Sequence, residues 1–177
     1  VAVFAKQDNN IVRQKVVDDS GNIYSKKSDD VDGSQVSEKL DLKIEAKKAT
    51  AAPAFNIFDI GVMAASTVRT RNGATLPLLT WLWASGKKGS CTGEVSCYQL
   101  SAKRISVLSI AKDPDEYDDL VLLHEYGHFY QYEYSRSDSP PGLSHDLSNR
   151  FDPRLAWGEG SATYFGNSVK STSLYLD

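Results

Sequence analysis

The sequence predicts an α+β fold in which a mixed sheet packs on a buried central helix, with a β-rich segment at the N-terminus. Short β-type runs fill residues 1–46, a helix and three further strand-like runs follow, and two helices with start signals come last. At 177 residues the chain is long enough for one sizeable core. We therefore expect a β-rich segment at residues 1–48 and one domain at residues 55–177.

The N-terminal segment alternates apolar and polar residues, as half-buried strands do. Strand-like runs occupy residues 1–4, 11–17 and 23–25, and a turn is expected at residues 18–22. Strict alternation returns at residues 40–46. We expect antiparallel β structure that supports or precedes the rest of the chain.

The middle of the chain predicts a helix followed by strands. Residues 47–54, which include Pro53, are typical of a linker. Residues 56–70 have the apolar spacing of a helix, and Asn72 and Gly73 form a favoured helix end. β-type residues then predict strands at residues 77–83, 98–102 and 105–110. This order places a sheet beside the helix that comes next.

Two later helices begin with capping signals. Asp113, Pro114 and Glu116 supply an N-cap acceptor, a proline in the first turn and an acidic residue at N3, which is the arrangement of a capping box. Asp152 and Pro153 give a similar signal for a helix that runs to residue 165. The acidic run around Asp113 lacks the alternating oxygen ligands and central glycine of a calcium loop, so capping is the preferred explanation.

The first of these helices carries His124, Glu125 and His128 in the pattern H-E-x-x-H. Residues i and i+4 lie on one face of a helix, so both imidazoles can turn toward one metal ion. Glu125 then lies beside the ion, placed to take a proton from the attacking water. The chain has three histidines in all, so this register is rare by chance. The pattern predicts a Zn²⁺ site with Glu125 as the catalytic base.

Glu159 is the predicted third ligand, because a catalytic zinc usually takes three protein ligands. Its neighbours one and two turns away are mostly small, which would let this helix approach the first closely. We expect Trp157, Tyr164 and Phe165 to point away from the metal and to anchor the helix in the core. A further donor should stabilise the oxyanion. His145 is a candidate, although a loop histidine without a special role explains it more simply.

These residues resemble the zincin metallopeptidases, and among them the gluzincins, in which H-E-x-x-H supplies two ligands and a glutamate on a later helix the third. Residues 157–162, Trp-Gly-Glu-Gly-Ser-Ala, resemble the third-ligand segment of several secreted bacterial members. The resemblance covers roughly residues 55–168 and implies a zincin-like sheet whose edge strand, within residues 98–110, pairs with an extended substrate. The third histidine of metzincins is absent, since residue 134 is tyrosine.

One departure from the gluzincin pattern concerns the support of the metal ligands. Many gluzincins carry an acidic residue four places after the ligand glutamate, where it orients a metal-binding histidine. Here that residue is Thr163. We therefore expect Asp146, Asp152 or the backbone to orient the histidine.

The composition argues against nucleic acid and membrane as partners. Net charge is −3, from 20 Lys and Arg against 23 Asp and Glu, and no basic cluster is dense enough to follow a phosphate backbone. No apolar run approaches the roughly 20 residues that span a bilayer. We expect a protein or peptide substrate, no nucleic acid and no membrane span; the oligomeric state is not indicated. Cys91 and Cys97 favour a disulfide over two free thiols, which argues for a secreted or extracytoplasmic protein.

The leading functional prediction is a zinc metallopeptidase that hydrolyses peptide bonds. Two alternatives remain open. The first is a catalytically inactive zincin-fold module for binding or adhesion, against which the intact Glu125 argues. The second is a zinc hydrolase that acts on a non-peptide amide, which would share the same site.

Overall fold

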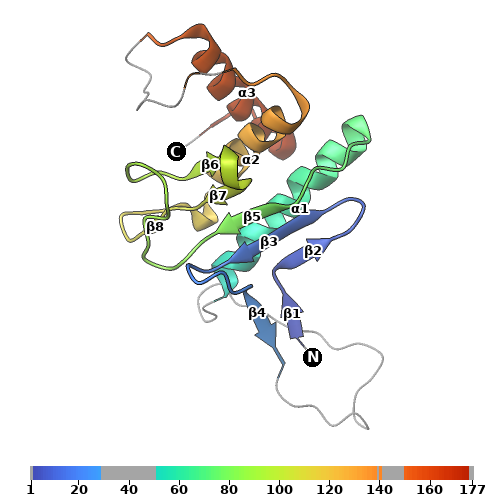
Figure 1. Ribbon diagram of the computed structural model, residues 1–177, viewed down its shortest axis with the longest axis vertical. Coiled ribbons are helices and arrows are strands. Elements are labelled where there is room, and N and C mark those ends of the chain that lie inside the picture. Colours follow the sequence, from blue (N-terminus) through green and yellow to red (C-terminus); the bar gives the residue numbers. More distant parts are fainter. Residues whose placement is uncertain (1, 29–50, 139, 141–149, 176–177) are drawn as a thin grey trace.

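The computed structural model describes residues 2–28, 51–138, 140 and 150–175, and these form an α+β structure with a mixed sheet (Figure 1). The described helices are α1 (Ala52–Asn72), α2 (Asp119–Tyr134) and α3 (Pro153–Lys170). The described strands are β1 (Ala2–Phe4), β2 (Lys6–Asp8), β3 (Arg13–Val17), β4 (Ser25–Lys27), β5 (Leu79–Leu82), β6 (Cys97–Gln99), β7 (Arg104–Ser106), β8 (Ser109–Ile110) and β9 (Asp113–Pro114). The predicted α+β class with a mixed sheet is confirmed.

Five strands form the main sheet in the order β2-β3-β5-β7-β6. Strands β3, β5 and β7 run parallel, whereas β2 and β6 pair antiparallel at the two edges. The register places Val16, Trp81, Ile105 and Tyr98 side by side in one row across four strands. The first three of these side chains are fully buried, so the row marks the face of the sheet that carries the core.

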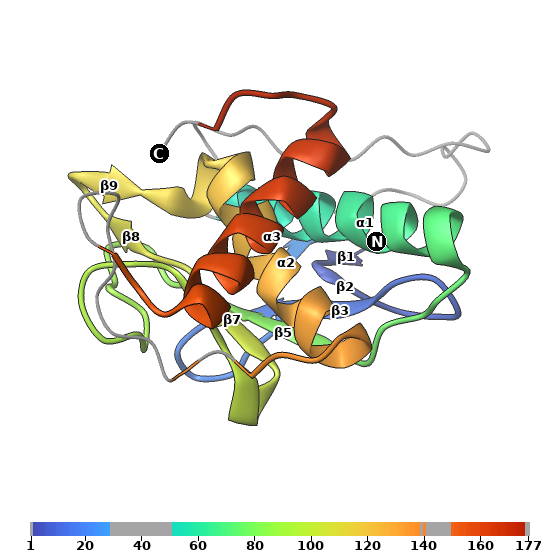
Figure 2. The same ribbon diagram turned by 90° about the horizontal axis from the view of Figure 1, so that it is seen from above.

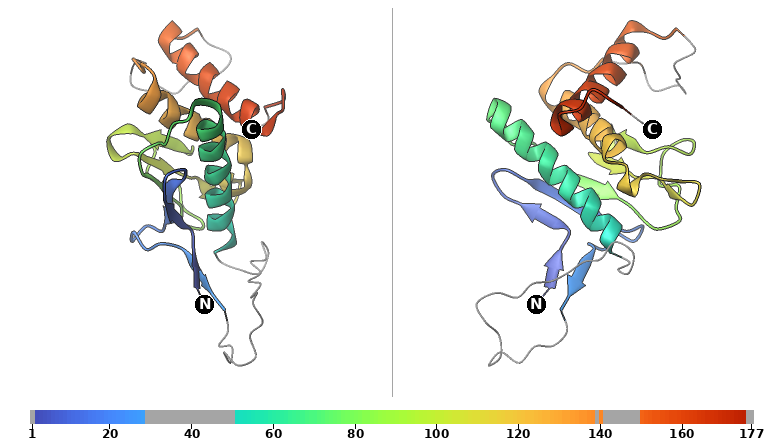
Figure 3. Two further views of the ribbon diagram at one scale, coloured as in Figure 1. Left: turned by 90° about the vertical axis from the view of Figure 1, so that its right-hand side faces the viewer. Right: turned by 180° about the vertical axis from the view of Figure 1, so that it is seen from behind.

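Helices α1 and α2 lie along one face of this sheet, and α3 lies on α2 at the end of the molecule away from β1 and β4 (Figures 1, 2 and 3). Trp81 of β5 stacks with Tyr126 of α2 at 6.2 Å between ring centroids, and Tyr98 of β6 contacts Phe129 of α2 at 5.7 Å. These aromatic contacts hold α2 against the sheet. None of the helices within the described ranges is long and apolar enough to cross a membrane.

The N-terminal segment contributes β2 and β3 to the same sheet as β5 and β7. Gln14 of β3 joins this segment to α1 and β5: its Nε2 donates to the carbonyl oxygen of Phe58 at 2.8 Å, and Trp81 Nε1 donates to its Oε1 at 3.0 Å. Gly61 makes room for Gln14, since a Cβ there would lie 2.0 Å from Gln14 Oε1. The alternation expected at residues 40–46 lies outside the described residues.

Helix α1 begins earlier than its apolar spacing predicts. Pro53, expected in a linker, lies in the first turn, where its missing N–H would have no helical partner in any case. The predicted end is confirmed, because Gly73 adopts φ 72° and donates its N–H to the carbonyl oxygen of Arg69.

The capping box expected at Asp113, Pro114 and Glu116 is wrong. The first two residues form β9, which pairs with β8, and α2 begins after Asp118. The Asp118 side chain accepts the N–H groups of Leu120 and Val121 at 3.0 and 3.1 Å. The upstream carboxylates are held elsewhere, since Ser96 donates to Asp115 at 2.6 Å and Ser109 donates to Glu116 at 3.0 Å.

The strands expected at residues 98–102 and 105–110 are shorter and broken. A 3-10 turn at Leu100–Ala102 and Lys103, at φ 44°, connect β6 to β7. The second run divides into β7 and β8, and only β7 belongs to the main sheet.

Helix α3 begins as predicted, with Asp152 accepting the N–H of Arg154 at 2.9 Å and Pro153 in the first turn. The core-anchoring role expected for Trp157 and Tyr164 is wrong, since they are 69% and 72% exposed. The two residues are seven positions apart on α3 and so lie on the same side of the helix. Phe165 does pack inward and stacks on Tyr126 and Tyr130; the centroid distances are 5.8 and 5.4 Å.

Candidate metal centre

Helix α2 places His124 and His128 one turn apart on the same face. Their ring centroids lie 4.7 Å apart, and their Nε2 atoms are 3.0 Å apart. The opposite side of this part of the helix is fixed in the core by Leu122, Tyr126 and Phe129, which are buried. The two imidazoles therefore project from a helix whose rotation is set by core packing.

Small residues bring α3 close enough to complete the cluster. Gly127 faces Ala162, so that a Cβ at residue 127 would lie 2.8 Å from the Cα and 3.0 Å from the carbonyl oxygen of Ala162. A Cβ at residue 166 would likewise lie 3.3 Å from the Cβ of Leu123. The close approach expected from the small side chains around Glu159 is confirmed.

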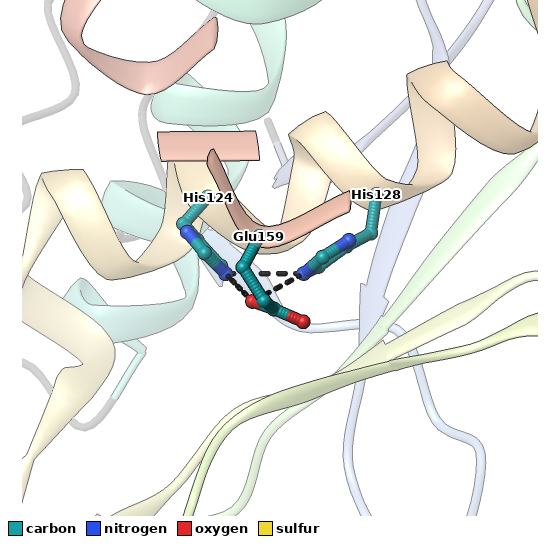
Figure 4. Close-up of side chains that lie close together, drawn as sticks. All are labelled: His124, His128 and Glu159. Carbon is teal, nitrogen blue, oxygen red and sulfur yellow. Dashed lines mark hydrogen bonds and ion pairs between the residues drawn. The ribbon is translucent and has the colours of Figure 1, made fainter. Parts of the chain in front are cut away.

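Glu159 of α3 points at both histidines (Figure 4). Its Oε2 lies 3.0 Å from His124 Nε2 and 3.3 Å from His128 Nε2. All three ligand atoms lie within 4.8 Å of one another. Ligand atoms at zinc-like bond lengths in a tetrahedral site are about 3.3 Å apart, so this spacing fits a single metal ion. His124, His128 and Glu159 could therefore hold a metal ion.

Thr163, which lies one turn after Glu159 on α3, contacts the ring of His124. Its Oγ1 lies 3.1 Å from His124 Nδ1 and leaves Nε2 directed at Glu159. Asp152 was one of the groups expected to orient a metal-binding histidine. This expectation is wrong, because Asp152 caps α3 and pairs with Arg154 at 2.8 Å. Asp146 lies outside the described residues. The hydroxyl reaches the position because α3 is so close to α2.

The neighbours of Glu159 stabilise its ionised form. Burial alone would raise the pKa of this carboxyl, but its hydrogen bonds with His124 and His128 hold the pKa well below its usual range. The side chains of His124, His128 and Glu159 are 14%, 23% and 25% exposed, so solvent reaches each of them.

Glu125 follows His124 on α2, is buried, and interacts electrostatically with His124 and Glu159. Its Oε2 accepts the main-chain N–H of Tyr98 in β6 at 2.6 Å. Burial raises the pKa of Glu125 to about 7, although the charge of His124 and the hydrogen bond from Tyr98 oppose the rise. The predicted base thus lies between the metal-binding face of α2 and the edge of the sheet.

No protein-family model, curated protein or solved structure matches this chain.

The structure also places Tyr175, which was not predicted, at the site. The ring of Tyr175 lies 6.1 Å from that of His124, centroid to centroid, and nothing in its sequence position signals this contact. Tyr164, expected to point away from the metal, is exposed. His145, the suggested oxyanion donor, lies outside the described residues.

The predicted disulfide is confirmed, since Cys91 and Cys97 are bonded. Cys97 is the first residue of β6, so the bridge ties the preceding loop to the strand that contacts Glu125. The strand therefore has a covalent anchor at its start as well as its pairing with β7.

Proposed function

We propose that this protein is a secreted zinc metallopeptidase of the gluzincin type. The observation that carries the proposal is the convergence of His124, His128 and Glu159 from two helices at ligand spacing, with Glu125 buried next to them. Two imidazole nitrogens and one carboxylate oxygen are a donor set typical of catalytic zinc, which keeps a further position open. The disulfide supports secretion, because such bonds persist in oxidising compartments.

The residues have separate roles in this proposal. Zn²⁺, when bound, would polarise the scissile carbonyl group and acidify water. Glu125 accepts a proton from the attacking water and delivers it to the leaving amine. His124, His128 and Glu159 hold the ion, and Thr163 fixes the ring of His124.

The substrate is proposed to be an extended protein or peptide chain. Strand β6 is an edge strand of the main sheet, overlaps the expected residues 98–110 at Tyr98 and Gln99, and contacts the base directly. An extended peptide that adds to such an edge gains main-chain hydrogen bonds that do not depend on its side chains. The scissile bond would then lie near Glu125.

Metal content and cleavage together test the proposal. Mass spectrometry should find about one zinc per wild-type chain, the loading of a three-ligand site. Glu159→Ala should lose most of this zinc. Asp19→Ala, which removes an exposed carboxylate from a turn, is the matched control and should keep it. Zinc retained in Glu159→Ala would contradict the ligand assignment.

Glu125→Gln separates catalysis from binding. The variant should keep its zinc and lose cleavage of a peptide library, because the amide cannot accept the proton from water. A wild-type protein that binds zinc but cleaves no peptide would instead favour a zincin-fold binding module or a hydrolase of other amides.

A further inference from the structure

Strand β6 presents one main-chain group to the candidate site. Tyr98 of β6 is in register with Ile105 of β7. In an antiparallel pair, the main-chain groups of successive residues point alternately toward and away from the partner strand. The N–H of Tyr98 points away from β7, because it donates to a side chain of α2.

The acceptor of this N–H is the proposed base, Glu125. The distance from Tyr98 N to Glu125 Oε2 is 2.6 Å, and Glu125 is buried, so little water competes for the carboxylate. Hydrogen bonds to an ionised group are the stronger class. A carboxylate has two oxygens, and holding Oε2 leaves Oε1 available to accept a proton.

Tyr98 contacts α2 at a second point one turn further along. Its ring packs on Phe129 at 5.7 Å between centroids, and Phe129 follows Glu125 by four residues on the same face of the helix. The disulfide at Cys97 anchors the residue before it. The position of the Tyr98 N–H relative to α2 is therefore defined by a ring contact, a strand pairing and a covalent bond.

We propose that the main-chain N–H of Tyr98 is the positioning group for Glu125, and that edge strand β6 thereby orients the base for proton transfer. This inference rests on the proposed peptidase function for its effect on the reaction, but the contact itself can be measured without any activity. The metal ligands do not take part in it, so zinc binding should not depend on it.

Amide hydrogen exchange tests the contact. In the full chain with zinc added, Glu125→Ala should speed exchange of the Tyr98 amide by about tenfold or more, the loss expected for a hydrogen bond to a charged group. The amides of Cys97 and Gln99, which belong to the same strand, are internal controls and should not change. Equal exchange of the Tyr98 amide in wild type and variant overturns the proposal, whether or not the protein cleaves peptides.

Tyr98→Pro tests the effect on the reaction, because proline lacks the N–H and is tolerated on edge strands. Tyr98→Ala is the matched control, since it loses the same side chain but keeps the N–H. Relative to that control, Tyr98→Pro should lower kcat by about ten- to a hundredfold, as expected for a misplaced catalytic group, with KM and zinc content little changed.

The outcomes distinguish the positioning role of the Tyr98 N–H from the proposed peptidase function. Equal kcat in the proline and alanine variants overturns the positioning role even if wild type is an active peptidase. If Tyr98→Pro fails to fold, the exchange measurement on Glu125→Ala still decides whether the contact exists. Exchange that responds as expected in a wild type that cleaves nothing rejects the proposed function, and with it any catalytic role for this contact.

Discussion

Gly127→Ala probes the close crossing of α2 and α3 that brings Glu159 to the histidines. The added Cβ would lie 2.8 Å from the Cα, 3.0 Å from the carbonyl oxygen and 3.2 Å from the Cβ of Ala162. Carbon atoms in contact are about 3.5–4.0 Å apart, so the helices must separate by roughly half an ångström or more. Overpacking of this kind destabilises by about 1–3 kcal/mol.

The stability loss will be partly hidden, because alanine is favoured over glycine inside a helix by about 0.5–1 kcal/mol. Zinc affinity is the sharper measurement. A displaced Glu159 can no longer keep its 3.0 and 3.3 Å spacing to His124 and His128. We expect affinity to fall by about tenfold or more, the effect of disturbing ligand geometry. Competition with a chromophoric chelator measures it, and urea unfolding measures stability.

Gly160→Ala is the control on α3. No atom of the residues that the structure describes lies within 4 Å of a Cβ at this residue, so the substitution should stabilise the helix and leave zinc affinity unchanged. The reasoning fails if Gly127→Ala matches Gly160→Ala in both zinc affinity and stability, because the crossing would then not limit the site.

Two further substitutions test the surroundings of the site. Thr163→Val keeps the side-chain shape but removes the hydroxyl 3.1 Å from His124 Nδ1, and should weaken zinc binding by about ten- to a hundredfold with little loss of stability; unchanged affinity would mean that the hydroxyl does not orient the ring. Replacing Cys91 and Cys97 by serine together should lower the free energy of unfolding by about 2 kcal/mol, the chain-entropy value for so short a loop, as measured by urea unfolding; an unchanged midpoint would show that the strand pairing of β6 holds the loop alone.

The parts of the site that follow from local periodicity could be predicted from the sequence. The H-E-x-x-H spacing fixes His124 and His128 on one helical face wherever the helix begins. Glu159 could be predicted because glycines and alanines around it signal a close helix contact. The start of α2 could not, since several acidic residues precede it and each is a possible cap. In the folded structure Asp115 and Glu116 accept hydrogen bonds from serine hydroxyls, so Asp118 is the residue that caps α2.

Burial and support depend on how the elements pack, and here the sequence misled. Trp157 and Tyr164 are large aromatic residues of the kind that usually pack in a core, yet they are 69% and 72% exposed on α3. Thr163 lacks the carboxylate that many gluzincins carry at this position, but the short distance between α2 and α3 lets its hydroxyl reach His124 Nδ1.

The contact between Tyr98 and Glu125 shows how far the chemistry depends on the sheet. The two residues are 27 positions apart, and they meet because α2 is held on the sheet by aromatic pairs such as Trp81 with Tyr126. Trp81 also donates a hydrogen bond to Gln14 in β3. The N-terminal strands therefore help to set the position of α2 relative to β6. Gln14→Ala, although remote, should therefore disturb the hydrogen bond between Glu125 and the Tyr98 N–H through the core. The change in the exchange rate of the Tyr98 amide would measure this coupling directly.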